Sequence, residues 1–472
     1  MAKKKRRDEN RRGDAGSARA DRWRGPTLAG LWLLILLPPV IFLPGLKENF
    51  RLPKQLLSEV LALLALLLLA VRLFAVQRVD WRRVLRHPAV LAVSPLVLVA
   101  LLGLATSDHT VRVRQGLVSL GIGAASLVAW SLALSRRERW RLLRATAAPA
   151  ILLSVVAILQ FHGLYEPFRF EGQITERLAV TSLAGSAFDL AAFLLLPLLV
   201  AQVALLTQRR STPALLGWGA VLVTGCWALL ASQTLTVLVA FGIASLVLWL
   251  QLLPARRLLP WVAGLTAVAV AATLLVTPLR HRLEEKASSL GDGEVNRFLT
   301  GRLDGWRAAW WMFREHPVAG VGHGAYRAEF GTAKLALAQE GVSFFRGQHQ
   351  VFFTNAHNEV LEVAAETGIL GLAALGWGGW LLWGCWRRSR PRIGPLGAPK
   401  EERALASAVL VAMALVAATN FPFRASMLAF PWILFLSGLF VPWDDEPAGA
   451  DPGGTGDGPQ SGDPGQPAGE TR

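Results

Sequence analysis

Cysteine and charged residues are both scarce in this chain of 472 residues. The two cysteines, Cys226 and Cys385, fall in long apolar segments that we expect to place them near opposite faces of a membrane, which excludes a fold held by disulfides. Charged residues make up 17% of the chain, whereas hydrophobic residues make up 53%. The hydrophobic residues come in long unbroken blocks and not in the pattern of water-soluble helices, so the sequence predicts that lipid surrounds most of the chain.

Twelve of these blocks have the length that a helix needs to cross a hydrocarbon core of ~30 Å. The sequence therefore predicts an all-α polytopic membrane protein. The expected spans lie near residues 27–45, 55–76, 88–106, 115–134, 145–163, 183–206, 213–231, 234–253, 258–277, 366–386, 403–419 and 425–442.

Lysine and arginine are distributed unevenly over the loops between these blocks. The short loops of one parity hold 18 of them and those of the other parity hold 8, and the amino-terminal tail adds ten to the richer set. Because these residues collect on the cytoplasmic side, both termini are predicted to be cytoplasmic. Topology and anionic lipid account for the net charge of +16, so we expect no nucleic-acid partner.

The two ends of the chain differ from its middle. A basic tail precedes an apolar stretch, as in a signal peptide, but that stretch contains "LPPV" and lacks a small-x-small cleavage site, so we expect it to remain as the first span. The carboxy-terminal Pro, Gly and acidic residues predict disorder. The predicted parts are a basic cytoplasmic tail (1–26), spans one to nine (27–277), a periplasmic cap loop (278–357), spans ten to twelve (358–442) and an acidic cytoplasmic tail (443–472).

The predicted cap loop is long for a connection without a function of its own. It contains "GRLDGWRAAWWMFREHPVAGVGHGAYRAEF", in which Trp306, Trp310 and Phe313 recur at helical spacing before a proline and three glycines. This composition is typical of folded structure. We therefore expect a membrane bundle that carries one folded outward cap.

Metal and phosphate-loop motifs are absent from the outward segments. Seven of the eight histidines fall there, but no pair has the spacing of a zinc HExxH motif, and no aspartate cluster of the magnesium-binding kind is present. The "GVGHG" run lacks the preceding strand and following lysine of a phosphate loop, so we interpret it as a turn that ends a helix. We expect no metal and no cofactor.

The stretch "TNAHNEVLEVAAETGILGL" puts a histidine and three glutamates where an apolar segment begins. If a helix starts after Asn355, a good capping residue, His357 lies in its first turn, and Glu359, Glu362 and Glu366 lie roughly 140° to 200° around the helix from it. We therefore expect that the glutamates do not orient the imidazole. His357 is either a solvated residue at a helix start or a general base that the positive helix end keeps neutral.

Arginine is the second candidate for chemistry on the outward side. Guanidinium groups match phosphate oxygens, and a cluster at the outer leaflet would suit a lipid pyrophosphate head group. A solvated face that pairs with nearby Glu and Asp is the alternative. The arginines concerned are Arg169, Arg177, Arg297, Arg302 and Arg307.

The segments "GRLDGWRAAWWMFREHPVAGVGHGAY" and "AHNEVLEVAAETGILGL" resemble the signature of the O-antigen ligase and polymerase superfamily. That signature has an Arg-led helix, a turn of the form HP-GVG-G and the motif HN-x-x-L-x-x-x-x-E-x-G-x-x-G. The similarity is specific over about residues 297–372 and fainter elsewhere. The resemblance implies a GT-C-like membrane glycosyltransferase that takes glycan from an undecaprenyl-diphosphate donor by an inverting, metal-independent reaction.

Site residues carry over from the resemblance one by one. His357 matches the histidine proposed to activate the acceptor hydroxyl, and Arg302 matches the cap arginine expected to bind the donor diphosphate. Arg177 matches loosely a second diphosphate contact in the family. Asn358 and Glu366 belong to the histidine motif and are expected to support the site.

The chain also departs from the family pattern. Val180 and "GSAF" replace the glycine and the Asn-Pro-Asn stretch that follow the arginine matched by Arg177. In the "ASQTLTV" segment, Gln233 stands where the family often has an arginine, so diphosphate binding there lacks a charge. Asp189, an acid inside the sixth span, is either a functional residue or a partner in a buried hydrogen bond between helices.

The resemblance therefore implies an enzyme of the inner membrane whose active site faces the periplasm. The expected partners are the undecaprenyl-diphosphate-linked glycan, an acceptor such as a lipid A core sugar or another glycan, and membrane lipids. A polymerase of the same superfamily is the nearest alternative. A flippase or transporter is the alternative from another class, although we find neither the paired halves nor the midplane polarity typical of transporters.

Overall fold

The computed structural model describes residues 23–43, 50–76, 80–165, 180–207, 212–344, 352–388 and 399–440, and these residues form helices joined by loops. Residues 23–36 form the first helical stretch. The others are α2 (Arg51–Val76), α3 (Trp81–Leu85), α4 (Pro88–Thr106), α5 (Thr110–Ala133), α6 (Arg136–Ala145), α7 (Ala147–Phe161), η1 (Ser182–Ala184), α9 (Ala187–Thr207), α10 (Thr212–Ala231), α11 (Leu235–Leu252), α12 (Ala255–Leu275), α13 (Thr277–Gly291), α14 (Val295–Phe298), α15 (Arg302–Glu315), α16 (Tyr326–Gln339), α17 (Glu359–Arg388), α18 (Pro399–Ala417), η2 (Pro422–Arg424) and α19 (Ser426–Ser437).

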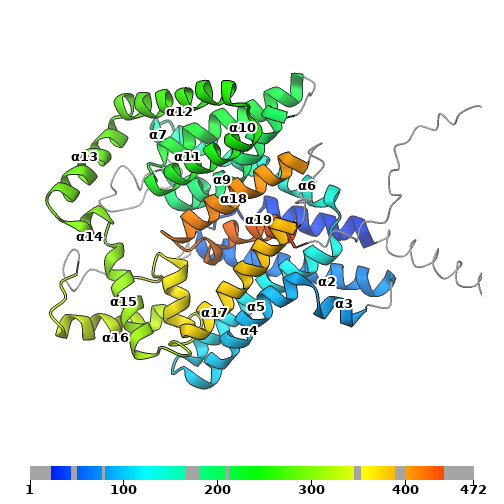
Figure 1. Ribbon diagram of the computed structural model, residues 1–472, viewed down its shortest axis with the longest axis vertical. Helices are drawn as coiled ribbons and strands as arrows, with labels where there is room; N and C mark the ends of the chain where they lie inside the picture. The colour runs from blue at the N-terminus through cyan, green and yellow to red at the C-terminus, as the bar shows by residue number, and fades with distance from the viewer. Residues whose placement is uncertain are drawn as a thin grey trace, which may run out of the picture.

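Helix α9 lies at the centre of the bundle. Its apolar residues cover every side of the helix, and 83% of its span is buried, a higher share than in any other described span. Helices α7, α10, α11, α18 and α19 pack around it (Figure 1). The outer helices leave large apolar side chains exposed, such as Leu67, Leu216 and Val223, and this surface suits lipid and not water.

Within the described residues, eight helices are long and apolar enough to cross a membrane, which makes the chain a multi-pass membrane protein. They coincide with the predicted spans two to eight and ten. The other four predicted spans coincide with residues 23–36, α12, α18 and α19, which fall outside these limits of length and apolarity; α19 is apolar but only 12 residues long. The count of twelve spans stays a prediction.

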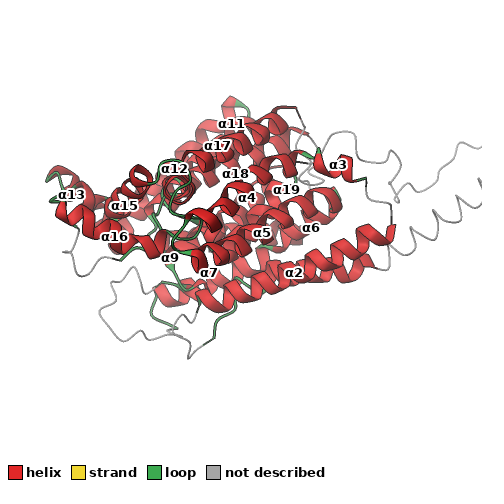
Figure 2. Ribbon diagram, turned by 90° about the horizontal axis from the view of Figure 1, so that it is seen from below, coloured by secondary structure: helices red, strands yellow, loops and turns green. Residues whose placement is uncertain are grey.

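The predicted cap region contains four helices, α13 to α16, which gather at one side of the bundle (Figure 1, Figure 2). Apolar residues from α15, α16 and the start of α17 form a small core of their own. Tyr326 is buried in this core, and its hydroxyl donates to the main-chain oxygen of Gly305 over 2.9 Å. The cap is therefore a folded unit, as its composition predicts.

The cap contacts the bundle at the end of α4 and the start of α5. Ser107 Oγ donates to the main-chain oxygen of Val321 over 2.5 Å, and His109 Nε2 lies 2.7 Å from Glu329 Oε2. These contacts join segments more than 200 residues apart in the chain. They fix α16 and the turn before it against two membrane helices.

Candidate active site

A break in α17 fixes where the cap meets the membrane bundle. Gly368 has φ 62° and ψ −157°, outside the helical region, and a Cβ at this position would lie 2.3 Å from a main-chain oxygen of the turn between α15 and α16. The α17 backbone bonds to that turn instead. Ile369 N–H donates to Pro317 O over 2.8 Å, and Gly322 N–H donates to Glu366 O over 2.9 Å.

The turn itself contains the "GVGHG" run. Helix α15 ends at Glu315 and α16 begins at Tyr326, so the interpretation of these glycines as a helix-ending turn is confirmed. Gly320 has φ 68°, and a Cβ on it would lie 2.2 Å from the carbonyl carbon of Glu366. Only glycine therefore allows the turn to lie directly against α17.

The helix that follows His357 begins later than the sequence analysis expects. Helix α17 starts at Glu359, and Asn358 caps it, because the Asn358 Oδ1 accepts a hydrogen bond from Leu361 N–H over 3.0 Å. His357 therefore precedes the helix, with φ 56° in the left-handed region. The predictions that Asn355 caps this helix and that His357 lies in its first turn are wrong.

One ring nitrogen of His357 forms a hydrogen bond, and the other is available to accept a proton. Its Nδ1 lies 3.0 Å from the main-chain oxygen of Asn355. A carbonyl oxygen can only accept, so Nδ1 carries the proton and donates, and Nε2 keeps its lone pair. The rings of Phe353 and Phe421 contact the imidazole edge-on, with centroids 5.4 Å and 5.0 Å away.

The surroundings of His357 keep its ring neutral near pH 7. Its pKa is lowered from 6.5 to about 4. Burial is the largest cause, the hydrogen bond to Asn355 opposes it, and the positive charge of Arg302 adds to it. Burial and a nearby cation therefore keep this imidazole uncharged.

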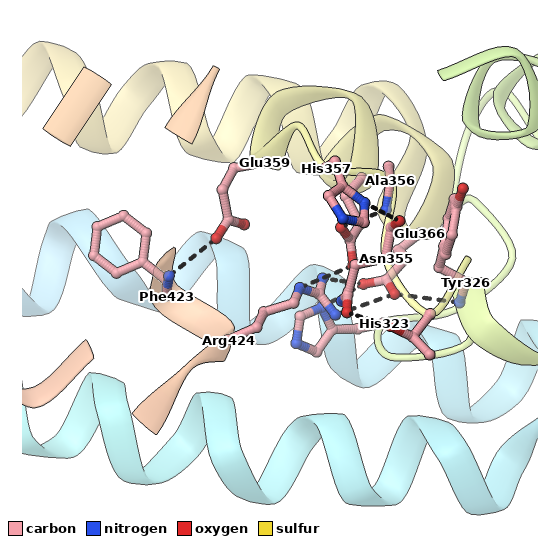
Figure 3. A network of polar contacts seen from close by, with 11 residues as sticks. His323, Tyr326, Asn355, Ala356, His357, Glu359, Glu366, Phe423 and Arg424 are labelled. Atoms are coloured by element: carbon pink, nitrogen blue, oxygen red, sulfur yellow. Dashed lines mark hydrogen bonds and ion pairs between the residues drawn. The ribbon is translucent and has the colours of Figure 1, made fainter. Parts of the chain in front are cut away.

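Beneath the His357 loop, an arginine joins two of the three glutamates (Figure 3). Arg424 Nε lies 3.1 Å from Glu362 Oε1, and Arg424 Nη2 lies 2.5 Å from Glu366 Oε2. His323 Nδ1 lies 3.2 Å from the same oxygen of Glu366. The third glutamate, Glu359, accepts a hydrogen bond from the main-chain N–H of Phe423, next to the arginine.

Opposing effects act on the pKa of Arg424. Burial lowers this pKa, but the carboxylates of Glu362, Glu366 and Glu359 raise it more, so the net shift is upward. Arg424 is therefore a fixed cation at the centre of the cluster. A buried ion pair of this kind needs every member, because removing one leaves a charge without compensation.

The cluster also holds the loop that carries His357. Glu362 accepts hydrogen bonds from Asn355 Nδ2 over 2.8 Å and from the main-chain N–H of Ala356 over 2.9 Å. No hydrogen bond or ion pair joins His357 to the glutamates among the described residues, although the helical angles behind that expectation do not apply to a residue outside the helix. The expectation that the glutamates leave the imidazole unoriented is nevertheless wrong, because Glu362 fixes both residues that precede it.

Arg302 is the first residue of α15 and lies near His357. Three residues further along α15, on the same face, Gly305 approaches the loop so closely that a Cβ on it would lie 3.2 Å from the main-chain oxygen of Ala356. Burial lowers the pKa of Arg302, and the neighbouring charge of Arg282 lowers it further. Within the described residues its guanidinium forms no hydrogen bond or ion pair.

The two remaining predicted phosphate contacts have different outcomes. Arg177, like Arg169, lies outside the described residues. Gln233 is buried in the turn between α10 and α11, with φ 50°. Residues on both sides of it, Leu230 and Leu235, pack against the start of α13, so this turn borders the cap, but no contact between Gln233 and Arg302 is found among the described residues.

Asp189 belongs to a separate group of residues. It lies in the first turn of α9, where its N–H donates to Ser186 Oγ over 3.1 Å. The charges of Arg51 and Lys54, at the start of α2, act on its carboxylate. No hydrogen bond or ion pair joins Asp189 to His357 among the described residues.

Sequence reasoning missed Arg424 and His323 as members of this cluster. Arg424 counted only as the single basic residue of a short loop, and His323 only as part of a glycine turn. A signal existed for Arg424, since three glutamates at the start of an apolar helix need a cation nearby. The described residues contain no group of three His, Cys, Asp or Glu that could hold a metal ion.

Comparison with known proteins gives one result for the region that contains this cluster. Residues 220–376 match the family model described as O-antigen ligase. The matched range begins within α10, covers α11 to α16 and ends within α17, and it includes Arg302 and His357. No curated protein matches the chain. The match supports a ligase- or polymerase-type membrane glycosyltransferase. Over residues 220–376, the match supports membership of the O-antigen ligase superfamily.

Proposed function

We propose that this protein transfers glycan from an undecaprenyl-diphosphate donor to an acceptor hydroxyl, with His357 as the general base and Arg302 as a diphosphate contact. The observation that carries the proposal is the pairing of these two residues. A neutral imidazole with a free Nε2 lies within the electrostatic reach of an arginine that has no described carboxylate partner. Acceptor activation and leaving-group stabilisation need such a pair.

The proposed step is a single displacement. His357 Nε2 takes the proton of the acceptor hydroxyl while its oxygen forms a bond to the anomeric carbon of the glycan. The bond from that carbon to the phosphate oxygen breaks, and the electron pair stays on the departing undecaprenyl diphosphate. Arg302 stabilises the charge that develops there, and the step as written requires no cofactor.

The proposed location is the inner membrane, with both chain termini cytoplasmic and the site facing the periplasm. The distribution of Lys and Arg over the loops supports this topology. On this topology Gln233 and Arg177 face the same side as the cap, and each remains a proposed further contact for the donor. The acceptor is a lipid A core sugar or, for a polymerase, another lipid-linked glycan.

Purified protein in liposomes that contain an undecaprenyl-diphosphate-linked glycan tests the proposal. With an added lipid A core acceptor, we expect glycan joined to the acceptor and free undecaprenyl diphosphate in equal amounts. Longer lipid-linked glycan without acceptor would identify the polymerase. Movement of the lipid-linked glycan between leaflets without any new bond would identify a flippase and overturn the proposal.

A further inference from the structure

A lysine of α13 fixes the turn that leads into Arg302. Lys286 Nζ donates to the main-chain oxygens of Arg297, over 2.9 Å, and Phe298, and to Thr300 Oγ1 over 2.8 Å. Thr300 has φ 59°, a left-handed conformation that is unfavourable for a residue other than glycine. The lysine contacts therefore hold a strained turn immediately before α15 and fix the position of Arg302, the first residue of that helix.

Arg282 lies on the same face of α13 as this lysine, one helical turn earlier. Its Nε is buried and has no hydrogen-bond partner among the described residues. Arg282 shares the α13 face from which Lys286 contacts the turn before Arg302, and the charge of Arg282 acts on Arg302. Glu285 acts on Arg282 from its own helix but forms no ion pair with it in the described part of the chain.

Two half-buried guanidinium groups side by side are unfavourable on their own. Their charges repel, and partial burial removes the water that would screen them. A buried donor without an acceptor adds a further cost. Both costs disappear when an anion with several oxygen atoms lies between the arginines, and each guanidinium then donates to it.

We propose that Arg282 is a second phosphate-binding residue of the donor site, so that Arg302 and Arg282 bind the two phosphates of the lipid diphosphate in sequence. The inference rests on the proposed function. Arg302, whose charge acts on His357, binds the phosphate that carries the sugar. Arg282, on the side of Arg302 that faces α13, binds the phosphate that carries the prenyl chain.

A matched control lies two residues away in α13. Arg280 is exposed, and its Nε lies 3.6 Å from Glu284 Oε1, so its charge already has a partner at the surface. Arg280→Gln and Arg282→Gln make the same chemical change in the same helix. Both variants lose one positive charge from the cap. A difference in lipid binding between them therefore reflects the position of the side chain.

The experiment measures binding of two synthetic lipids, a polyprenyl diphosphate and the matching polyprenyl monophosphate, to the purified full chain in nanodiscs. For the unaltered protein we expect tighter binding of the diphosphate. Arg282→Gln should weaken diphosphate binding by about tenfold or more, the effect of one charge-assisted hydrogen bond, and leave monophosphate binding within about twofold. The diphosphate affinity of Arg282→Lys should lie between those of the unaltered protein and Arg282→Gln, because lysine keeps the positive charge but lacks the planar set of N–H donors of a guanidinium.

The outcomes separate this inference from the function on which it rests. If the unaltered protein neither prefers the diphosphate nor transfers glycan, the proposed function fails. If it does both and Arg282→Gln binds the diphosphate as well as the unaltered protein, or no worse than Arg280→Gln, the role of Arg282 is overturned. A folding defect would lower binding of both lipids equally in Arg282→Gln and Arg282→Lys, and that result also counts against the inference.

Discussion

The main-chain N–H of Ala356 donates to Glu362 Oε2 over 2.9 Å, and this bond links the residue before His357 to the first turns of the helix after it. The same carboxylate accepts from Asn355 Nδ2 and lies beside Arg424. One glutamate therefore connects a membrane helix, the His357 loop and a distant arginine. The left-handed conformation of His357 is held by this connection and not by its own preference.

The buried cation at the centre of this cluster is expected to be essential for stability. In Arg424→Gln, Glu362 and Glu366 lose the charge that compensates them, and we expect the free energy of unfolding to fall by about 3–5 kcal/mol. Thermal unfolding in detergent measures this loss. The control is Arg314→Gln, which breaks the exposed pair with Glu340 and should cost at most about 1 kcal/mol. Equal losses in the two variants would contradict a central role for Arg424.

His357 is expected to be needed for transfer but not for donor binding. His357→Ala removes the proposed base, so the transfer rate should fall by about 10²- to 10⁴-fold while the donor affinity stays within about twofold. Single-turnover transfer and lipid binding measure the two quantities. His281→Ala, at an exposed histidine of the cap, should leave both unchanged. Transfer by the His357 variant at the full rate would remove it from the mechanism.

The pH dependence of transfer should reflect the lowered pKa of His357. Proton transfer needs the neutral ring, so kcat/KM should stay high at pH 5.5 and fall as the pH drops through about 4, the folded-state pKa. The free energy of unfolding should also fall as the pH decreases. Below pH 6.5 the unfolded imidazole binds a proton that the folded one does not, so stability is lost as the pH falls from 6.5 towards 4. An acid limb at pH 6.5 would mean that the ring is not buried during catalysis.

Arg302 is expected to act on the donor. Arg302→Gln removes the guanidinium whose charge acts on His357, and we expect the donor KM to rise by about tenfold or more at unchanged expression. Arg297→Gln is the matched change, because Arg297 is exposed and its Nη1 lies 3.1 Å from Glu294. Titration of the lipid-linked donor at fixed acceptor measures both. A donor KM equal to that of the unaltered protein would exclude Arg302 from the site.

The break in α17 should tolerate no side chain. Gly368→Ala puts a Cβ into the turn before α16 in a conformation open only to glycine, and we expect a loss of at least about 2 kcal/mol in unfolding free energy. Gly376→Ala, in the same helix with open space around it, should leave stability equal or slightly higher. Thermal unfolding compares the two. A Gly368 variant as stable as the Gly376 variant would show that the break is not needed.

Local patterns predicted part of this molecule well. The apolar blocks predicted the spans that the structure describes, and the aromatic spacing predicted a folded cap with a helix at Trp306. The resemblance pointed to Arg302 and His357; the charge of Arg302 acts on His357 in the structure, and the roles of both residues stay predictions. These predictions rest on patterns within about twenty residues of sequence or on a sequence motif.

Contacts between distant segments were not predictable in the same way. Arg424 lies 58 residues after its partner Glu366, and nothing in a single sequence says which helix faces which. The helical angles assumed that His357 lies inside the helix, and they also missed the effect of Glu362 through the main chain of Ala356. The start of α17 was also misplaced, because two asparagines, Asn355 and Asn358, offered the same capping chemistry three residues apart.

The hydrogen bonds between the turn before α16 and the broken helix α17 affect when the site forms as well as its shape. Separating the turn from α17 would break the hydrogen bonds that Gly322 N–H and Ile369 N–H donate, each of which contributes about 0.5–1.5 kcal/mol. Hinged opening between this turn and α17 would therefore cost free energy. These contacts hold the proposed base, His357, and the proposed phosphate contact, Arg302, in fixed relative positions, so on the proposed function substrates would meet a preorganised site.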